Sequence, residues 1–393
     1  AAAWRATLRQ MRVGHTVVRG DRYSHVAPDE SDCRADVQVL NLSTPLEQHL
    51  SAAMNRAFDP SDDCPFRAFV CCAPRPVFGV VYHHWAADSY CIRWLLREWF
   101  EHMLDPTHES RPAQPPSGGL WQHFGPSAAG WHLDEGILGL LRYRTRFTRA
   151  RPCVRPMGDC RVAVSLHQVP APIVPELIHH ARRRHATLHD AVLAVIAEAV
   201  DRFGANPPRP DRDELALGTV VDLRTRASRQ LSDQFGLFLG FTTTIVRHQD
   251  LREFPRLLRT VANQNSWQKR THAAEASLLR MAAGLLEAKL HSPRRWAELY
   301  RQRMPIAAGV SNVNMNRDWP GRRHPSPVTD YYRVAPTGPM LPLIFTPTTL
   351  GDRLNFLITR QIEQITDDQL TRLAEFVSHR LERLAAAEAE WDS

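Results

Sequence analysis

The sequence contains almost no lysine and no long apolar run. Lys269 and Lys289 are the only two lysines among 49 basic residues, so the net charge of +7 comes almost entirely from arginine. The arginines are scattered and form no basic tail or recognised nucleic-acid motif, so we expect no nucleic-acid partner. No apolar stretch reaches the roughly 18 residues that suggest a membrane-spanning helix, and the start, AAAWRATLRQ, shows no signal peptide. We therefore expect no membrane span.

The cysteines provide neither a disulfide framework nor a zinc site. There are seven of them, an odd number, and none of their spacings is CxxC. The 19 histidines include no HExxH pattern, which makes a metal site a weak alternative. We therefore predict a protein of the reducing cytoplasm that holds no metal.

The length predicts more than one core. A chain of 393 residues with 43% hydrophobic residues is too long for a single small core and suggests two domains. Residues 105–130 are rich in proline and glycine and are typical of an extended connector. We therefore expect an N-terminal domain over residues 1–130 and a C-terminal domain over residues 131–393.

The most informative stretch covers residues 77–89, VFGVVYHHWAADS. Its first six residues are apolar, β-branched or aromatic and predict a buried strand, which a short turn joins to a strand over residues 66–72 as a hairpin. His83 and His84 follow, then Asp88, and Ser89 is expected to cap the next helix. Both histidines thus lie on a strand-to-helix turn, where a side chain can point into a cleft. Histidine can take up and return a proton near neutral pH.

This stretch resembles the HHxxxDG motif of the chloramphenicol acetyltransferase-like superfamily. That superfamily includes condensation domains of peptide synthetases, wax ester synthases and plant acyltransferases that use coenzyme A thioesters. The motif is complete through Asp88, but Ser89 stands in place of its final glycine.

Two later segments support the resemblance. Residues 221–226, VDLRTR, look like the VDxRxR segment of the plant-type enzymes, although the asparagine that should follow a nearby glycine is absent after both Gly236 and Gly240. Ser311, Asn312 and Val313 look like the SNVP segment of wax ester synthases without its proline.

The resemblance implies an α/β (α+β) fold with two chloramphenicol acetyltransferase-like lobes. Each lobe would be a mixed β-sheet flanked by helices, with the active site in a tunnel between the lobes.

In the second half, Thr187 and Asp190 are expected to cap a long apolar helix. Residues 341–346 and 353–359 are expected to pair as strands, with Pro342 placing the first of them towards a sheet edge.

The resemblance also assigns roles to individual residues. His84 would be the general base, and His83 a structural histidine that bonds the backbone. Asp88 could face the imidazole as the acid of a triad does. In the superfamily, however, the aspartate pairs with an arginine of the second half, which is Arg224 here, and holds the turn in shape. A bidentate pair suits that role.

Four further residues are candidates for contact with substrate. Trp85 could close over a ligand, and Ser311 and Asn312 belong to the second supporting segment. The oxyanion of the tetrahedral intermediate needs donors. Candidates are the backbone N–H groups of the turn, Ser89 or Ser311.

Three functions fit this pattern. The first is an acyltransferase that moves an acyl group from acyl-coenzyme A or an acyl carrier protein to a hydroxyl or amine, without a covalent intermediate. The second is a condensation-type domain that joins carrier-bound substrates by an amide or ester bond. The third is an inactive scaffold, suggested by Ser89 and the missing asparagine.

The partners expected are the same for both enzymatic functions. We expect no permanently bound cofactor, because the acyl-coenzyme A or phosphopantetheine thioester is a co-substrate. The other partners would be a small-molecule acyl acceptor and, for a carrier-bound donor, an acyl carrier protein. We expect a monomer with a role in secondary metabolism.

Overall fold

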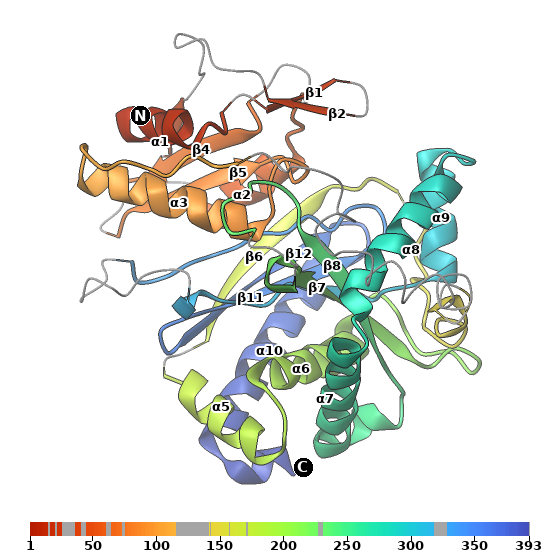
Figure 1. The fold of residues 1–393 in the computed structure, drawn as a ribbon. Coiled ribbons are helices and arrows are strands. Elements are labelled where there is room, and N and C mark those ends of the chain that lie inside the picture. Colours follow the sequence, from red (N-terminus) through yellow and green to blue (C-terminus); the bar gives the residue numbers. More distant parts are fainter. Residues whose placement is uncertain are drawn as a thin grey trace. The chain divides into compact units, whose positions relative to one another are not determined.

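The structure is a computed structural model of the chain (Figure 1). It describes residues 1–14, 16–19, 22–25, 36–40, 45–59, 64–72, 75–114, 141, 143–156, 158–169, 172–226, 231–317 and 328–392. Most of the predicted connector therefore lies outside the described residues. The chain divides into two compact units. Unit 1 comprises Ala1–Pro126 and Asp222–Leu239, and unit 2 comprises Ser127–Val221 and Gly240–Ser393.

Unit 1 contains a small mixed sheet. Its described strands are β3 (Val37–Leu40), β4 (Phe66–Cys71) and β5 (Val77–Tyr82). β3 runs parallel to β4, and β4 forms the predicted antiparallel hairpin with β5, in which Phe66 faces Tyr82. β4 and β5 form strands because they are rich in β-branched and aromatic residues, which favour the pleated strand. The hairpin thus delivers both histidines at the end of β5.

Helices cover this sheet and fix the turn that follows it. They are α1 (Ala2–Met11), α2 (Leu46–Asn55) and α3 (Ser89–Leu104). α1 packs on α3, with the rings of Trp4 and Trp99 4.8 Å apart and both side chains 1% exposed. A separate hairpin joins β1 (Thr16–Arg19) to β2 (Arg22–His25). α3 is buried along most of its length, with buried residues from Cys91 to His102.

Unit 2 is built on a larger mixed sheet, with seven strands among the described residues. The strands are β6 (Val162–Val169), β7 (Leu215–Asp222), β8 (Leu239–Val246), β9 (Ala308–Val310), β10 (Val313–Asn314), β11 (Leu343–Leu350) and β12 (Arg353–Gln361). Their order is β6-β12-β11-β9-β7-β8, with β10 beside β11. β11 and β12 pair antiparallel as predicted.

The expectation that Pro342 marks a sheet edge is wrong. β11 lies between β12 and β9, inside the sheet. Pro342 precedes the first residue of the strand, where its missing N–H removes no ladder bond, and its carbonyl accepts the N–H of Gln361 at 2.9 Å.

Four helices pack together on one face of the large sheet (Figure 1). They are α5 (Val174–Arg183), α6 (Leu188–Phe203), α7 (Phe254–Arg270) and α10 (Asp367–Ala386). α6 begins with the predicted cap, a reciprocal capping box between Thr187 and Asp190. Every residue from Asp190 to Val200 is buried, so α6 is the central helix of the unit. Two further helices, α8 (Ala273–Ala288) and α9 (Pro293–Arg303), complete the described set.

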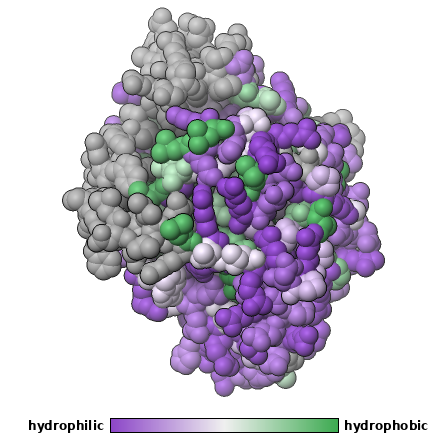
Figure 2. Space-filling view, turned by 90° about the vertical axis from the view of Figure 1, so that its right-hand side faces the viewer, coloured by the Kyte–Doolittle hydropathy of each residue, from purple (hydrophilic) through white to green (hydrophobic). Residues whose placement is uncertain are grey.

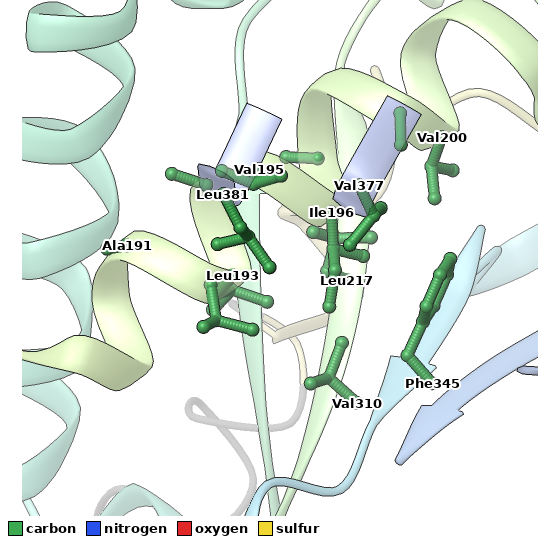
Figure 3. Packing of buried hydrophobic residues seen from close by; sticks show 14 of the residues in the cluster. Ala191, Leu193, Val195, Ile196, Val200, Leu217, Val310, Phe345, Val377 and Leu381 are labelled. Atoms are coloured by element: carbon green, nitrogen blue, oxygen red, sulfur yellow. The ribbon is translucent and has the colours of Figure 1, made fainter. Parts of the chain in front are cut away.

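The core of unit 2 lies between α6 and the sheet. Figure 3 shows Leu193 and Ile196 of α6 among Leu217, Val310 and Phe345 of three strands. Side chains of α10 join the same cluster, including Val377 and Leu381. This mixed α/β architecture, with a mixed sheet in each unit, confirms the expected fold class.

The surface is largely hydrophilic on the face shown in Figure 2, where the apolar patches are small and separate. Within the described ranges, no helix combines the length and the hydropathy that crossing a bilayer requires.

Candidate active site

The turn between β5 and α3 carries the two histidines of the HHxxxD motif. The N–H of His83 donates to the carbonyl of Pro65 at 2.9 Å, and the N–H of Ala86 donates back to the carbonyl of His83 at 3.0 Å. Both histidine side chains are half-buried. The backbone of the turn is therefore tied to the neighbouring segment and to itself.

The side chain of His83 makes a hydrogen bond to the backbone. Its Nδ1 accepts the N–H of Trp85 at 3.4 Å, and its ring packs edge-on against Phe58 with centroids 5.8 Å apart. Burial lowers the pKa of His83, and the neighbouring His84 lowers it further. An Nδ1 that accepts a hydrogen bond requires the neutral ring with its proton on Nε2. Trp85 is half-buried, and its ring lies 5.3 Å from that of His83.

His84 differs from His83 in having uncommitted nitrogens. Its ring lies 5.8 Å from that of Tyr82, at an interplanar angle of 50°. In the part of the chain that the structure describes, neither ring nitrogen of His84 has a hydrogen-bond partner. A half-buried imidazole with a nitrogen lone pair available is the chemical requirement for a general base.

Asp88 is fully buried and its carboxylate is committed to structure. Oδ1 accepts the N–H of Cys91 at 3.1 Å and so caps α3, while Oδ2 accepts the N–H of Phe238 at 3.0 Å. Oδ2 also binds Nη1 of Arg224, and the Asp88 N–H donates to the carbonyl of Gly236 at 3.2 Å. Asp88 thus joins the start of α3 to the segment around Gly236.

The expectation that Ser89 caps α3 is wrong, because Asp88 is the N-cap and Ser89 is the first helical residue. Position 88 has the extended backbone that a cap needs, and its side chain reaches the N–H three residues on. Ser89 is half-buried, and its Oγ accepts a hydrogen bond from Nη1 of Arg93 at 3.1 Å.

Arg224 forms the ion pair with Asp88 that the resemblance implied, but the pair is not bidentate. Nη1 binds Asp88, while Nη2 donates to the carbonyls of Gly236 at 3.2 Å and Gln234 at 3.4 Å. The guanidinium also lies 4.6 Å from the ring of Tyr90 and 4.5 Å from that of Phe238. The fork is therefore split between the Asp88 carboxylate and two backbone carbonyls, while Oδ1 of Asp88 accepts the N–H of Cys91.

The acidic groups around Arg224 affect the pKa of its guanidinium. Burial is the largest single effect and lowers the pKa of the Arg224 guanidinium, but Asp88, Cys91 and Asp222 together outweigh it, so the pKa is raised. Burial raises the pKa of Asp222, whose Oδ1 accepts the N–H of Arg224 at 2.9 Å. The Arg224 guanidinium therefore keeps its positive charge at neutral pH although it is buried.

Sequence reasoning missed Cys91, which belongs to this cluster. Its thiol is fully buried, lies 3.0 Å from Nη2 of Arg224 and accepts the N–H of Gly236 at 3.3 Å. Burial raises the pKa of Cys91 well above its usual value, and the nearby Asp88 adds to the shift. Its position three residues after Asp88, in the first turn of the helix, was the only signal available.

Ser311 and Asn312 lie in unit 2, directly after β9. Ser311 donates its N–H to Phe345 at 2.9 Å, and its Oγ accepts a hydrogen bond from Nη1 of Arg333 at 3.1 Å. Asn312 Nδ2 lies 3.3 Å from Nδ1 of His189, on the first turn of α6. Burial lowers the pKa of His189.

Neither of these contacts in unit 2 could be predicted from the sequence. Arg333 also donates to the Pro347 carbonyl at 2.9 Å and to Thr348 Oγ1 at 3.1 Å, so it holds the Ser311 segment to β11. His189 is half-buried in the first turn of α6. Among all the residues that the structure describes, no group of three or more His, Cys, Asp or Glu side chains is arranged to hold a metal ion.

Comparison with known proteins gives structural matches only. No protein-family model and no curated sequence matches the chain. Among solved structures, the epimerization domain of the third module of tyrocidine synthetase B (TycB3(E)) aligns with a TM-score of 0.61 and 11% identity, covering 99% of this chain and 89% of that domain.

Two further structures agree. The first condensation domain of the calcium-dependent antibiotic synthetase has a TM-score of 0.65 and 15% identity, covering 98% of this chain and 88% of that one. The nonribosomal peptide synthetase FmoA3 has a TM-score of 0.63 and 15% identity, and the chain spans 40% of its length. At such identities the likeness shows the fold, which is the two-lobe chloramphenicol acetyltransferase-like fold that the sequence resemblance implied.

Proposed function

We propose that the protein is a condensation-type acyltransferase. It would join an acyl group, held as a thioester on a phosphopantetheine carrier, to an amine or hydroxyl of a second substrate. The fold comparison supports a condensation-type domain, since the similar structures include a condensation domain and an epimerization domain of peptide synthetases. The observation that carries the proposal is that the ring nitrogens of His84 have no partner in the described residues, while the turn that carries His84 is held by the hydrogen bonds of Asp88 to Arg224 and Phe238.

His84 acts as general base in this proposal. Its imidazole removes the proton from the acceptor amine or hydroxyl as that atom attacks the thioester carbonyl. A C–N or C–O bond forms, the tetrahedral intermediate collapses with cleavage of the C–S bond, and the imidazolium returns the proton to the leaving thiolate. No covalent acyl-enzyme is formed, because the thioester is already an activated donor.

Asp88 and Arg224 are positioning residues in this mechanism. Oδ1 of Asp88 caps α3, and Oδ2 is shared between Arg224 and the N–H of Phe238. The carboxylate therefore has no oxygen directed at His84 as a triad acid would, and it acts by holding the turn. His83 supports the same turn through the N–H of Trp85.

The oxyanion requires donors that are not already used. Trp85, Ala86 and Asp88 each donate their backbone N–H within the cluster. Across the described residues, the N–H groups of His84 and Ala87 have no partner. We propose these two groups as the backbone donors. Ser311 is the side-chain alternative, because a hydroxyl whose oxygen accepts from Arg333 keeps its own proton to donate.

The remaining candidate residues would contact the substrate. Trp85, Ser89 and Asn312 are the side chains we propose for substrate contact, with Trp85 offering an aromatic surface beside His83. A donor on coenzyme A would follow the same chemistry at His84. The two donors differ only in what carries the phosphopantetheine arm, so one assay distinguishes them.

The test is a paired-substrate assay read by mass spectrometry. The full chain is mixed with acyl groups on a phosphopantetheinylated carrier protein or on coenzyme A, together with a panel of amines and alcohols. The expected result is amide or ester product, and free thiol released only when donor and acceptor are both present. His84→Ala should lower the rate about 10²–10⁴-fold.

The matched control is His379→Ala, which removes an exposed histidine of α10. It should retain the full rate. Equal activity of the His84→Ala variant and the control would overturn the mechanism. Absence of product from every donor, with folded protein, would favour the inactive scaffold.

A further inference from the structure

Unit 2 has a hollow of about 530 Å³ that is lined almost entirely by polar and charged side chains. It lies around the end of β8, the short helix η2 (Asp250–Arg252) and one face of α7. Ile245 is the single apolar residue in its lining. None of the lining residues belongs to the candidate active site.

The carboxylates in the hollow are already paired. Asp250 binds Nε of Arg256 at 2.6 Å, and Glu214 lies 3.8 Å from Nε of Arg149, which is outside the lining. Three other lining cations are Arg146, Arg247 and Arg259. Over the ranges that the structure describes, none of the three has a carboxylate within ion-pair distance. The hollow therefore carries positive charge that the protein does not neutralise.

Arg146 is the most constrained of these cations. Its side chain is half-buried, Nη2 lies 3.5 Å from Oε1 of Gln264, and the guanidinium lies 5.9 Å from the ring of Trp267. Burial lowers the pKa of Arg146. Gln264 is itself fixed by the N–H of Ile245 at 3.1 Å and its carbonyl at 2.6 Å. A bound anion would offset the cost of burying this charge.

α7 directs a second set of donors into the same space. Arg256, Thr260 and Asn263 recur at three- and four-residue intervals and so share one face of the helix, with Arg259 beside them. A hydroxyl and an amide thus stand next to the guanidinium groups. Arginine combined with neutral N–H and O–H donors matches the oxygens of a phosphate, which accept several hydrogen bonds at once.

We propose that this hollow binds the phosphate group of a small molecule, with Arg146, Arg247 and Arg259 as its cationic ligands. Its volume lies in the range of small-molecule sites, about 300–1,000 Å³. The charged lining disfavours an apolar ligand, and the concave form suits a compact anion better than a broad acidic protein surface. The site goes beyond the proposed acyl transfer and does not depend on it.

The test is calorimetric titration of the full chain with inorganic phosphate, coenzyme A and 3′-dephospho-coenzyme A. Saturable phosphate binding that weakens as salt is added is expected. Tighter binding of coenzyme A that falls about tenfold without the 3′-phosphate would identify a phosphorylated cofactor as the ligand. Equal affinity of both coenzymes and phosphate would identify phosphate itself, and either pattern supports the site.

Variants locate the binding. Arg259→Gln and Arg146→Gln should each weaken phosphate binding about tenfold or more, because each removes a charged hydrogen bond. Arg252→Gln is the matched control: an exposed arginine of η2 outside the lining, with the same change of charge. Circular dichroism checks that each variant is folded.

Three outcomes would overturn the proposal. They are no saturable phosphate binding, equal losses in the Arg252→Gln control and the lining variants, or binding of a poly-glutamate peptide without binding of phosphate. The last would point to an acidic protein partner. None of these measurements uses acyl transfer, so the result is independent of the proposed enzymatic activity.

Discussion

The carboxylate of Asp88 and the guanidinium of Arg224 form a buried ion pair across 136 residues of sequence. The aspartate is 0% exposed and the arginine 7%. Each partner also makes hydrogen bonds to the backbone, Asp88 to the N–H groups of Cys91 and Phe238, and Arg224 to the carbonyls of Gln234 and Gly236. Because each side chain holds backbone groups as well as its ionic partner, loss of either one leaves several buried groups without partners.

Replacing Asp88 should destabilise unit 1 strongly. Asp88→Ala removes the helix cap and leaves the Arg224 charge buried without its counter-ion, so we expect a loss of about 3–5 kcal/mol in the free energy of unfolding. Urea denaturation followed by tryptophan fluorescence measures it. The matched control is Asp233→Ala, which removes a partly exposed partner of the exposed Arg111 and should cost less than about 1 kcal/mol.

A double variant measures how much of the stability loss comes from the interaction between Asp88 and Arg224 themselves. Asp88→Ala combined with Arg224→Met should be less unstable than the sum of the two single variants, since the second change removes the stranded charge. Strict additivity would show that the two side chains do not interact.

The Cys91 thiol should resist alkylation in the folded protein. Burial and the Asp88 charge raise its pKa well above the usual value, so little thiolate forms at pH 8. Cys72 and Cys160 are exposed and serve as internal controls. Iodoacetamide labelling followed by peptide mapping should modify Cys91 more than about tenfold more slowly than either control. Comparable rates in native protein would contradict the buried position.

Unit 2 should lose stability as the pH falls from 7.5 to 5. Burial lowers the pKa of His189 below the 6.5 of a free imidazole, so the unfolded chain binds the proton more readily. The contribution of neutral His189 is therefore complete above about pH 6.5 and is lost as the pH falls towards the lowered pKa. One proton gives at most about 1.4 kcal/mol per pH unit.

The measurement is the thermal unfolding midpoint between pH 5 and 7.5. His189→Gln should have a shallower pH dependence than the parent chain, whereas His179→Gln, which replaces an exposed histidine of α5, should not. Parallel curves for all three proteins would rule out a role for His189 in acid sensitivity.

The core of unit 2 should be sensitive to truncation at α6. Leu193 is fully buried within the cluster of Figure 3, so Leu193→Ala should cost about 2–5 kcal/mol in the free energy of unfolding. Leu290→Ala is the matched control, because that leucine is 79% exposed and its loss should change stability by less than about 0.5 kcal/mol. Chemical denaturation compares the two, and similar losses would place Leu193 outside the core.

The sequence predicted the local features well, because they depend on neighbouring residues. The β4–β5 hairpin follows from two apolar runs and a short turn, and the capping box at Thr187 and Asp190 follows from a three-residue spacing. The cap of α3 was misassigned to Ser89, since Asp88 and Ser89 are both good caps and spacing alone cannot separate them.

The long-range contacts could not be predicted from composition or period. The ion pair of Asp88 was anticipated only through the family resemblance, and its split geometry depends on Cys91 and Phe238, which no pattern singled out. The contacts of Arg333 with Ser311, and of His189 with Asn312, join positions 22 and 123 residues apart. The prediction that Pro342 marks a sheet edge failed because a proline interrupts strand pairing only inside the ladder, and Pro342 lies just before its first residue.

The assignment of residues 222–239 to unit 1 has a practical consequence for fragments of this protein. A polypeptide ending at residue 126 would contain the Asp88 carboxylate but not the arginine that neutralises it, so it should be recovered mainly as aggregate. Adding a synthetic peptide of residues 222–239 in trans would restore that cation, and refolding should then depend on peptide concentration.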